Sequence, residues 1–593
     1  MSDLILPPVI CQKIKGYTYV RTYKNVRVDG KKYPVKVNVV TIAEINNAAG
    51  SGRLIFKKDF LATHPELEGK VVLREYDSDL GKYVFKFASV AEQKEKETQA
   101  FVAKVNSVKS VGFYYVCNNL LENDPLVKAL KATFKDSYNK LLSLGMFCAN
   151  DNGNGFVADH YSYYAQRNKL PYSEPLSCSQ ITKLFKNISE ASVLNFFCEY
   201  AKQLYENNSL NKNRFWALDS TSISTYSRYL DAKFGHNKQG EDLPQVNVMM
   251  MTDEKSGRPL FYEMFNGSIP DVSTIAKTFK MLLQLDVRSF VAVMDRGYYS
   301  KDNLGSIINC GYHFLVCTPH NKVKEYDSII KEAQLSFVKG EGFNAKTKQF
   351  SFTKKHSITV KNPKTNRDNT HQIYVHVFFS ASYSGKEMEI LACRRDAVTK
   401  LIKEGKELDG ANLDFFNKYL EKDENGNITY NTNAYVEAGQ TAGLFVLLSD
   451  SINDADVAYR AYKEREAVEV CFKDLKVKMG CDRFDVSSED SLVGKCFVEF
   501  IALSIRMLLL NIILKCKRKG YKYPTDSLEK IIHELDGISQ VEYTNGFVSL
   551  MDVSKTQHQI LRMFHCTIPD DYYSNNLAYA NRLDKAKKPH GDN

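Results

Sequence analysis

Four chemically capable side chains recur at helical spacing in the segment DADVAYRAYKEREAVEVCFKDLKVKM, residues 454–479. They are Tyr462, Arg465, Glu469 and Lys476. An α-helix turns about 100° per residue, so all four fall within an arc of about 60°. Apolar residues fill the neighbouring arc, as in a helix that buries one stripe and presents a polar stripe at its edge. A solvated charged face produces the same pattern, so the helix alone leaves both interpretations open.

Two aspartates accompany short apolar segments that are predicted to be strands. Asp219 lies in RFWALDSTSIS, and Asp295 directly follows SFVAVM. Taken singly, Asp219 could cap a turn and Asp295 could be a turn residue paired with Arg296. Between residues 214 and 319 the predicted order is β-β-β-α-β-α-β, which matches the ribonuclease H-like fold. In that fold the first and fourth strands are neighbours and a later helix crosses them, so both aspartates would meet Glu469.

Three converging carboxylates repel one another and need cations to persist. Carboxylate and water oxygens suit Mg²⁺ or Mn²⁺. Two such ions, about 3.5–4 Å apart, can activate an attacking oxygen and stabilise a leaving one in phosphodiester chemistry. Arg465 and Lys476 suit phosphate groups, as a bidentate fork and a point charge. Glu466 falls at about 40° on the same wheel and could also face the site.

The motifs LDST around Asp219, MDRGYYS around Asp295 and Y-x2-R-x3-E-x6-K from Tyr462 to Lys476 carry a family resemblance. The chain resembles the DDE transposases of bacterial insertion sequences, in the insertion-sequence-four superfamily. It is similar to the branch with a long β-rich insertion before Glu469. The resemblance covers most of the chain and is strongest over residues 214–319 and 443–515.

The resemblance implies cut-and-paste transposition. An activated water would hydrolyse one strand at the transposon end, and the freed 3′-hydroxyl would attack the opposite strand and later the target DNA. Asp219, Asp295 and Glu469 would hold two Mg²⁺ or Mn²⁺ ions. DNA contacts are expected from four further side chains: Tyr462, Arg465, Lys476 and Arg296. An aromatic residue, either Phe445 or Tyr435, would hold a flipped base.

The partners implied are double-stranded DNA, at terminal inverted repeats and at the target, and a second copy of the chain in a synaptic complex. The location implied is the bacterial cytoplasm, with association to the nucleoid when DNA is bound. Two alternatives stay open. One is a ribonuclease H-like nuclease that cuts without strand transfer, and the other is a catalytically silent derivative that only binds DNA.

The fold class predicted is α/β, a ribonuclease H-like core interrupted by a β-rich insertion. Flanking it are N-terminal β-hairpin and helical DNA-binding regions and a small C-terminal appendage. The predicted division is a basic β-rich region at 1–110, a helical region at 111–210, a first core segment at 211–319, the insertion at 320–442, a second core segment at 443–520, and an α/β appendage with a tail at 521–593.

The N-terminal hairpin, residues 13–36, carries eight basic residues and one acid, Asp29, which with Gly30 gives a turn signal. It could grip DNA phosphates or be a charged, solvated edge. The net charge of +10 is compatible with a polyanionic partner. In the helical region Gly145 is expected to end a helix. The tail NRLDKAKKPHGDN is expected to be disordered.

No signal peptide is recognised at the start of the sequence. The longest apolar run, residues 497–514, contains Glu499, Arg506 and Asn511, which favours a buried helix of a soluble protein over a membrane span. The thirteen cysteines form no CxxC pair, so we expect buried thiols and no disulfide framework or zinc site.

Overall fold

The computed structural model divides into two compact units, residues 1–107 with 541–549, and residues 108–540 with 550–593. It describes residues 6–566 with several gaps, so the C-terminal tail expected to be disordered lies outside the described residues. The gaps are 15–16, 30, 32, 46–49, 68–69, 78–79, 88–104, 151–157, 207–214, 226–243, 320–324, 362–366, 424–426, 485, 487, 522–524, 526 and 545–547.

The first unit is built from antiparallel strands. One sheet has the order β1-β2-β3-β5 and a second the order β4-β6-β7. The basic hairpin expected over residues 13–36 is found in part. Strands β2 and β3 pair from Val26 opposite Val35 to Thr18 opposite Ile45, so the second strand runs nine residues beyond the predicted end. Residues 15, 16, 30 and 32 of the hairpin are not described. The elements are β1 (Val9–Ile14), β2 (Tyr17–Val26), β3 (Val35–Ile45), β4 (Gly52–Arg53), β5 (Ile55–Phe56), α1 (Lys58–Thr63), β6 (Val72–Asp77) and β7 (Lys82–Phe87).

The next segment is helical, as predicted, but Gly145 does not end a helix. It lies inside α5 (Tyr138–Asn150), where a Cβ atom would come within 2.5 Å of Ile501 on α17 (Glu489–Arg518). Gly145 is therefore used for close helix packing instead of termination. After strand β8 (Val105–Ser110) the helices are α3 (Gly112–Leu121), α4 (Pro125–Phe134), α5 (Tyr138–Asn150), α6 (Ala158–Arg167), α7 (Cys178–Lys186) and α8 (Glu190–Glu206).

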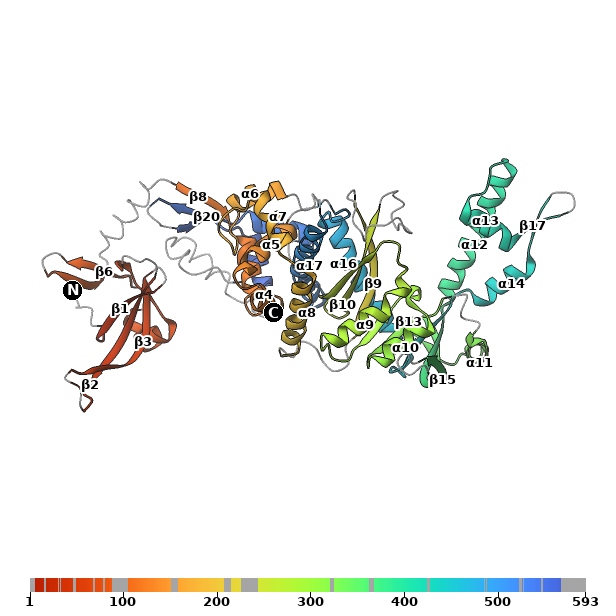
Figure 1. Ribbon diagram of the computed structural model, residues 1–593, viewed down its shortest axis with the longest axis horizontal. Helices are drawn as coiled ribbons and strands as arrows, with labels where there is room; N and C mark the ends of the chain where they lie inside the picture. Colours follow the sequence, from red (N-terminus) through yellow and green to blue (C-terminus); the bar gives the residue numbers. More distant parts are fainter. Residues whose placement is uncertain are drawn as a thin grey trace, which may run out of the picture. The chain divides into compact units, whose positions relative to one another are not determined.

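A sheet of nine strands forms the centre of the second unit (Figure 1), in the order β11-β10-β9-β12-β13-β19-β16-β15-β14. The expected order β-β-β-α-β-α-β is confirmed, and the first and fourth of its strands, β9 and β12, are parallel neighbours. The strands are β9 (Phe215–Ser224), β10 (Gln245–Asp253), β11 (Pro259–Asn266), β12 (Val291–Met294), β13 (His313–Cys317), β14 (Phe343–Asn344), β15 (Gln349–Lys361), β16 (Asp368–Phe379) and β19 (Leu444–Ser449).

Strands β12 and β13 are buried on both faces, as the uninterrupted apolar runs of parallel strands require. Val291, Val293 and Leu315 pack with helix α15 (Ala455–Glu464) on one face. Ala292 and Phe314 belong to the larger core on the other face. There α9 (Ile275–Gln284) packs against α10 (Lys301–Asn309) beside the sheet (Figure 1).

The insertion is not β-rich throughout, which corrects the sequence-based expectation. Its N-terminal portion, after helix α11 (Asp327–Val338), adds β14, β15 and β16 to the central sheet. Its C-terminal portion is helical: α12 (Ala381–Lys403), α13 (Gly410–Tyr419) and α14 (Thr432–Thr441), with the short hairpin β17 (Leu420–Lys422) and β18 (Ile428–Tyr430). Helix α12 buries only Val398 among its described residues. A helix with so small a buried face needs no periodic apolar residues, and such periodicity is the main sequence signal for a helix.

The segment 454–479 forms three successive pieces instead of one helix. Asp454 caps α15, its side chain accepting a hydrogen bond from the backbone N–H of Val457, and α16 (Glu466–Lys473) follows after Arg465. A π-helical turn, η6 (Asp474–Lys478), comes next, and Gly480 ends the segment with a positive φ of 66°.

Helix α17 (Glu489–Arg518) is long and apolar enough to cross a membrane by length and composition alone. However, 72% of its most apolar window is buried inside the protein, and α17 packs against α5, α7 and β11. This is the environment of a core helix. The C-terminal elements that follow are α18 (Leu528–Asp536), β20 (Ser539–Tyr543), β21 (Val548–Leu550) and α19 (Lys555–Met563).

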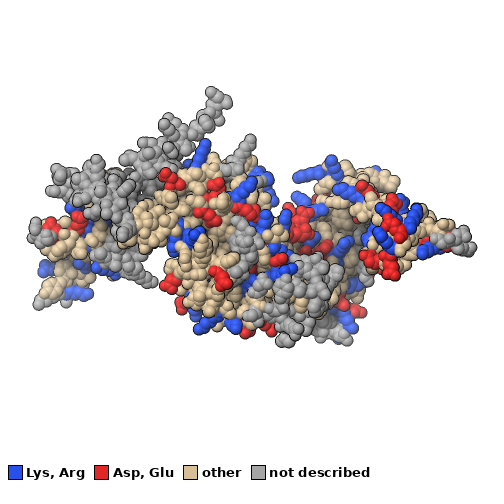
Figure 2. Space-filling model, turned by 90° about the horizontal axis from the view of Figure 1, so that it is seen from above, with Lys and Arg blue, Asp and Glu red and all other residues tan. Residues whose placement is uncertain are grey.

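All thirteen cysteines lie in described residues and are free thiols. Six are buried, six are half-buried and Cys393 is exposed, so the expectation of buried thiols is met only in part. Figure 2 shows Lys and Arg interspersed with Asp and Glu over the face of the molecule seen there. On this face the basic side chains therefore do not form one continuous patch but alternate with acidic side chains.

Candidate active site

Two carboxylates lie side by side on the sheet because their strands are parallel neighbours. Leu218 of β9 pairs with Met294 of β12, so the next residues, Asp219 and Asp295, follow at the same level. Each carboxylate accepts a hydrogen bond from the backbone N–H of the next residue, Ser220 or Arg296, at 2.8 Å. These local bonds fix the orientation of both side chains.

Arg465, at the junction of α15 and α16, joins the third carboxylate to the first. Its Nη1 lies 3.4 Å from Asp219 Oδ2, and its Nη2 lies 3.0 Å from Glu469 Oε1. The Arg465 side chain is 12% exposed, whereas that of Glu469 is 54% exposed. Burial alone would lower the pKa of the guanidinium, but Asp295, Asp219 and Glu469 among its neighbours raise it. Arg465 is thus a fixed cation at the centre of the acidic group.

Tyr462 connects α15 to the remaining carboxylate. Its hydroxyl donates a hydrogen bond of 3.0 Å to Asp295 Oδ1. Its ring is partly buried beside Val291 and Val293. Burial raises the pKa of Tyr462, so the phenol stays protonated and remains a donor. The structure therefore places the tyrosine hydroxyl on a carboxylate of the site.

The remaining sequence-predicted residues lie at the margins of this group. Lys476 in η6 donates from Nζ to the carbonyl oxygen of Ser222, 2.5 Å away on β9. Arg296 is exposed directly after Asp295. Glu466 is exposed on the first turn of α16, and the contacts to Arg465 described above come from Glu469.

The carboxylates fit a divalent cation by chemistry, although their present spacing is set by Arg465. Among the described residues, no three His, Cys, Asp or Glu side chains lie close enough to hold a metal ion as they stand. Arg465 occupies the position between Asp219 and Glu469 and neutralises them as a cation would. Carboxylate oxygens are ligands of choice for Mg²⁺ or Mn²⁺, so Asp219, Asp295 and Glu469 fit such an ion by the chemistry of their oxygens, and Arg465 would compete with the ion for two of them.

A fourth acid that the sequence analysis did not single out belongs to the surroundings of the site. Ser220, next to Asp219, donates from Oγ to Asp271 Oδ1 at 2.6 Å. Burial, and after it Asp271, Asp219 and Asp295, raise the pKa of Tyr298. Asp271 begins a single 3-10 turn, so no periodic pattern marked it; its contact depends on a strand distant in sequence.

The two aromatic candidates for base capture are both packed in aromatic clusters. Phe445 on β19 stacks on Phe378, with ring centroids 4.8 Å apart. Tyr435 on α14 lies against Tyr419 and Tyr430 at the far end of the insertion. The choice between them stays a prediction.

Comparison with known proteins bears on the same region of the chain. The transposase DDE domain family matches residues 211–505, which include Asp219, Asp295 and Glu469. The match covers just under half of the chain and supports the expected DDE transposase domain. No curated protein matches the chain. A cryo-EM structure of a piggyBac transposase synaptic complex with hairpin DNA is similar at 11% identity and a TM-score of 0.34, over 80% of this chain and 86% of that chain. These values are too low to establish a shared fold.

Proposed function

We propose that the chain is a cut-and-paste DNA transposase of the insertion-sequence-four superfamily, with a ribonuclease H-like core. The match of residues 211–505 to the transposase DDE domain family supports this proposal. It would bind transposon ends, cleave them and join the 3′-hydroxyl to target DNA. The observation that supports this most directly is the convergence of Asp219, Asp295 and Glu469 around Tyr462 and Arg465. Chance does not readily bring three carboxylates and a buried guanidinium from distant segments together.

Asp219, Asp295 and Glu469 would hold two Mg²⁺ or Mn²⁺ ions. When bound, two such ions activate the attacking oxygen and stabilise the leaving oxygen of a phosphodiester. The chain's own contribution is to orient the ligands. The Tyr462 hydroxyl on α15 donates to Asp295, and the backbone N–H groups of the following residues donate to Asp219 and Asp295.

Arg465, Lys476 and Arg296 would contact DNA phosphates. Arg465 has a planar fork that fits two phosphate oxygens. A DNA phosphate beside the site would compete with Asp219 and Glu469 for the guanidinium of Arg465. Each hydrogen bond that Arg465 made to the phosphate would replace one that it now makes to a carboxylate oxygen. Tyr462 would act in this process through Asp295, to which it is already bonded.

The partners proposed are double-stranded DNA, as terminal inverted repeats and as target, and a second copy of the chain in the synaptic complex. The setting proposed is the cytoplasm of a bacterium, with the protein on the nucleoid when bound to DNA. The basic hairpin β2–β3 is the first candidate for binding DNA away from the site.

The test uses the inverted repeats that flank the gene as substrate. Purified protein with Mg²⁺ is expected to nick a labelled repeat at its end and to join the 3′-end to a supercoiled plasmid. Nicking without joining would favour a ribonuclease H-like nuclease. Binding without nicking would favour a silent DNA-binding derivative. Absence of both binding and nicking would contradict a function on these ends.

A further inference from the structure

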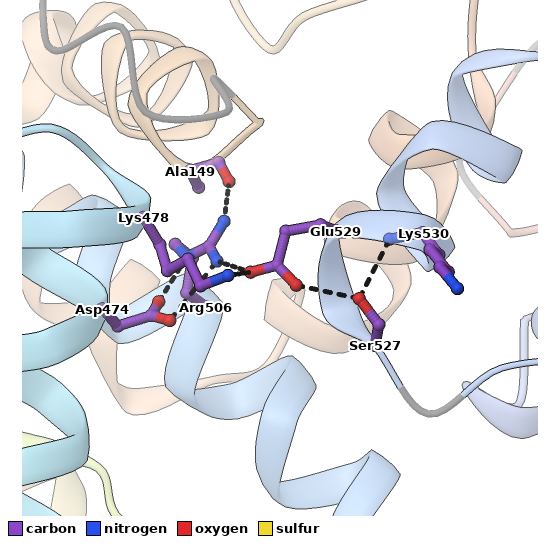
Figure 3. A network of polar contacts seen from close by, with 7 residues as sticks. All are labelled: Ala149, Asp474, Lys478, Arg506, Ser527, Glu529 and Lys530. Carbon is purple, nitrogen blue, oxygen red and sulfur yellow. Dashed lines mark hydrogen bonds and ion pairs between the residues drawn. The ribbon is translucent and has the colours of Figure 1, made fainter.

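An ionic network around one buried arginine includes Asp474 and Lys478 of η6, the turn that also carries Lys476 (Figure 3). Its centre is Arg506 on α17, which is fully buried. The guanidinium holds both carboxylate oxygens of Asp474, through Nε to Oδ2 and through Nη2 to Oδ1 at 3.4 Å. It also donates a hydrogen bond of 2.9 Å to the carbonyl oxygen of Ala149 on α5 and one of 3.2 Å to Glu529 Oε1 on α18. Four elements thus meet at one side chain.

Glu529 is itself held from two further sides. Ser527 donates from Oγ to Glu529 Oε2 at 2.9 Å, and Lys478 Nζ lies 3.3 Å from Oε1 (Figure 3). Although burial opposes it, hydrogen bonds from the backbone, Ser527 and Lys478 lower the pKa of Glu529. The network therefore contains a carboxylate that stays ionised and faces two cations.

Stability alone does not account for this arrangement. Taking an arginine and a carboxylate out of water is costly, and packed apolar side chains of similar volume usually serve a core as well or better. A buried pair does, however, fix geometry, because a bidentate contact defines both distance and direction. The question is which geometry the pair of Asp474 and Arg506 fixes.

The element that it fixes is the π-helical turn η6. Asp474 is its first residue, and the backbone N–H of Met479 closes the wide turn onto the Asp474 carbonyl at 2.9 Å. A π-turn adds a residue to the helical ladder and rotates the residues beyond its start away from the α-helical wheel. Lys476 lies inside this turn and reaches β9 at Ser222, three residues beyond Asp219. Lys478 in the same turn reaches the opposite way, to Glu529.

We propose that the network of Asp474, Arg506 and Glu529 is a positioning device, which anchors η6 so that Lys476 is presented at β9 beside the carboxylate site. Arg506 touches no reacting group and acts through Lys476. The inference rests on the proposed function, since Lys476 is taken to meet a DNA phosphate. Three residues outside the Y-x2-R-x3-E-x6-K motif would thus determine the position of Lys476, the last residue of that motif.

The test exploits the apolar replacement of a buried pair. In D474L/R506M both charges are removed together, and the thermal midpoint is expected to stay within about 4 °C of wild type. Glu529 keeps Lys478 and Ser527 as partners in this variant. The probe is a fluorescein-labelled random-sequence DNA duplex without divalent cation, titrated at several salt concentrations. Loss of one phosphate contact lowers the slope of log affinity against log salt by about one.

Lys476→Ala is expected to lower that slope by about one, and D474L/R506M by nearly as much. Combining the three substitutions should lower it no further, because both changes remove the same contact. If the slope changes of Lys476→Ala and D474L/R506M add in the triple variant, or if D474L/R506M leaves the slope unchanged, the network has only a structural role and the inference is overturned. If D474L/R506M fails to fold, Glu529→Gln is used in its place, because Arg506 still has Asp474 as a partner in that variant. Glu529→Gln is expected to lower the slope in the wild-type background and to leave it unchanged in the Lys476→Ala background. Any other result overturns the inference.

The same titration separates this inference from the proposed function. A wild-type protein that binds the duplex with no salt dependence would overturn the proposed function, and this inference with it. Salt-dependent binding by wild type, with full additivity in the variants, would overturn the inference and leave the proposed function standing.

Discussion

Arg465 sets the charge balance of the candidate site at the scale of single residues. It touches Asp219 and Glu469, and with 12% exposure it is much less solvated than Glu469. Glu466 and Glu469 are both exposed on the first turn of α16, but among the described contacts Arg465 is held by Glu469 and not by Glu466. This distinction leads to two predictions.

Glu469→Gln is expected to abolish strand cleavage while leaving binding to end DNA intact. Loss of a metal-binding carboxylate removes several kcal/mol of transition-state stabilisation, which corresponds to about a thousandfold in rate. The measurement is nicking of a labelled end with Mg²⁺, beside a band-shift titration. Glu466→Gln, three residues earlier, is the matched control and should cleave normally. Normal cleavage by Glu469→Gln with loss in Glu466→Gln would mean that the helix register is misassigned.

Arg465→Gln is expected to tighten Mn²⁺ binding by the DNA-free protein by about fivefold to tenfold, because the guanidinium competes with the cation for Asp219 and Glu469. Free Mn²⁺ measured by electron paramagnetic resonance reports this directly, with no need for activity. Arg460→Gln, on the exposed side of α15, is the control and should leave Mn²⁺ binding unchanged. Weaker Mn²⁺ binding in Arg465→Gln would argue that the arginine organises the ligands and does not compete.

The sequence predicted the residues of the candidate site, and the structure shows that only some of the contacts expected among them are made. The helical wheel placed Arg465, Glu469 and Lys476 on one stripe because it assumed a constant turn per residue. Arg465 and Glu469 do contact each other, whereas the π-turn carries Lys476 to Ser222 on β9. A π-turn depends on tertiary partners such as Arg506, and no local pattern announces it. Asp271 was missed for the same reason, since its partner Ser220 is distant in sequence.

At the scale of elements, close packing decides where helices begin and end. Gly145 was expected to end a helix but lies within α5, at the point where α17 approaches. The helix α12 was missed because only Val398 is buried along its described length, and a helix without an apolar face has no periodicity to detect. Strands β12, β13 and β19 were predictable because each is an apolar run bounded by turn residues.

Two glycines in helices give opposite predictions for the same substitution. Gly145→Ala is expected to destabilise the protein by about 1–3 kcal/mol, because the new methyl group would lie 2.5 Å from Ile501. Gly385→Ala in α12 has open space around it and is expected to stabilise by about 0.5–1 kcal/mol. Urea unfolding followed by circular dichroism compares the two variants with wild type. Destabilisation by both would contradict the assigned packing of Gly385.

His376 on β16 ties the central sheet to the segment before α15. Its ring nitrogens contact Thr353 Oγ1 at 2.8 Å and the carbonyl oxygen of Ile452 at 3.0 Å. Burial lowers the pKa of His376 to about 4. Between that value and the ordinary 6.5, the unfolded chain binds a proton that the folded chain does not. The stability contributed by neutral His376 is therefore complete above pH 6.5 and is lost as the pH falls toward 4.

We expect the free energy of unfolding to fall by up to about 3 kcal/mol between pH 6.5 and 4 through this group, at about 1.4 kcal/mol per pK unit. His376→Gln should flatten this region of the profile, although it is less stable than wild type at pH 7. The exposed His160→Gln is the control and should leave the profile unchanged. An identical acid profile in wild type and His376→Gln would contradict the assignment. The measurement is urea unfolding at intervals across this pH range.

At the scale of the whole molecule, the pairing of β9 with β12 was predictable, whereas the extension of the central sheet by β14, β15 and β16 and the distribution of charge were not. Element order defines which strands can be neighbours, and the parallel pair β9–β12 follows from it. The net charge of +10 says nothing about position. Figure 2 shows acidic and basic groups intermixed on one face, so a DNA-binding surface cannot be assigned from total charge and must come from local clusters.

The basic hairpin β2–β3 is the local cluster to test first. Lys24, Arg27 and Lys31 are exposed there, at the end of β2 and in the turn that follows. If each meets one phosphate, the triple change to Gln should lower the slope of log affinity against log salt by about 2.7, at about 0.9 per contact. The measurement is fluorescence anisotropy on a DNA duplex at several salt concentrations. The variant should retain the thermal midpoint of wild type, because exposed charges contribute little to stability.

The matched control replaces Lys400, Lys403 and Lys406, which are exposed at and after the end of α12, by Gln. Both triple variants remove three positive charges, so a difference between them reports position and not net charge. We expect the control to change the slope by much less than the hairpin variant. A larger change in the control would move the DNA-binding surface from the hairpin to the insertion, and equal changes would mean that binding in this assay follows net charge alone.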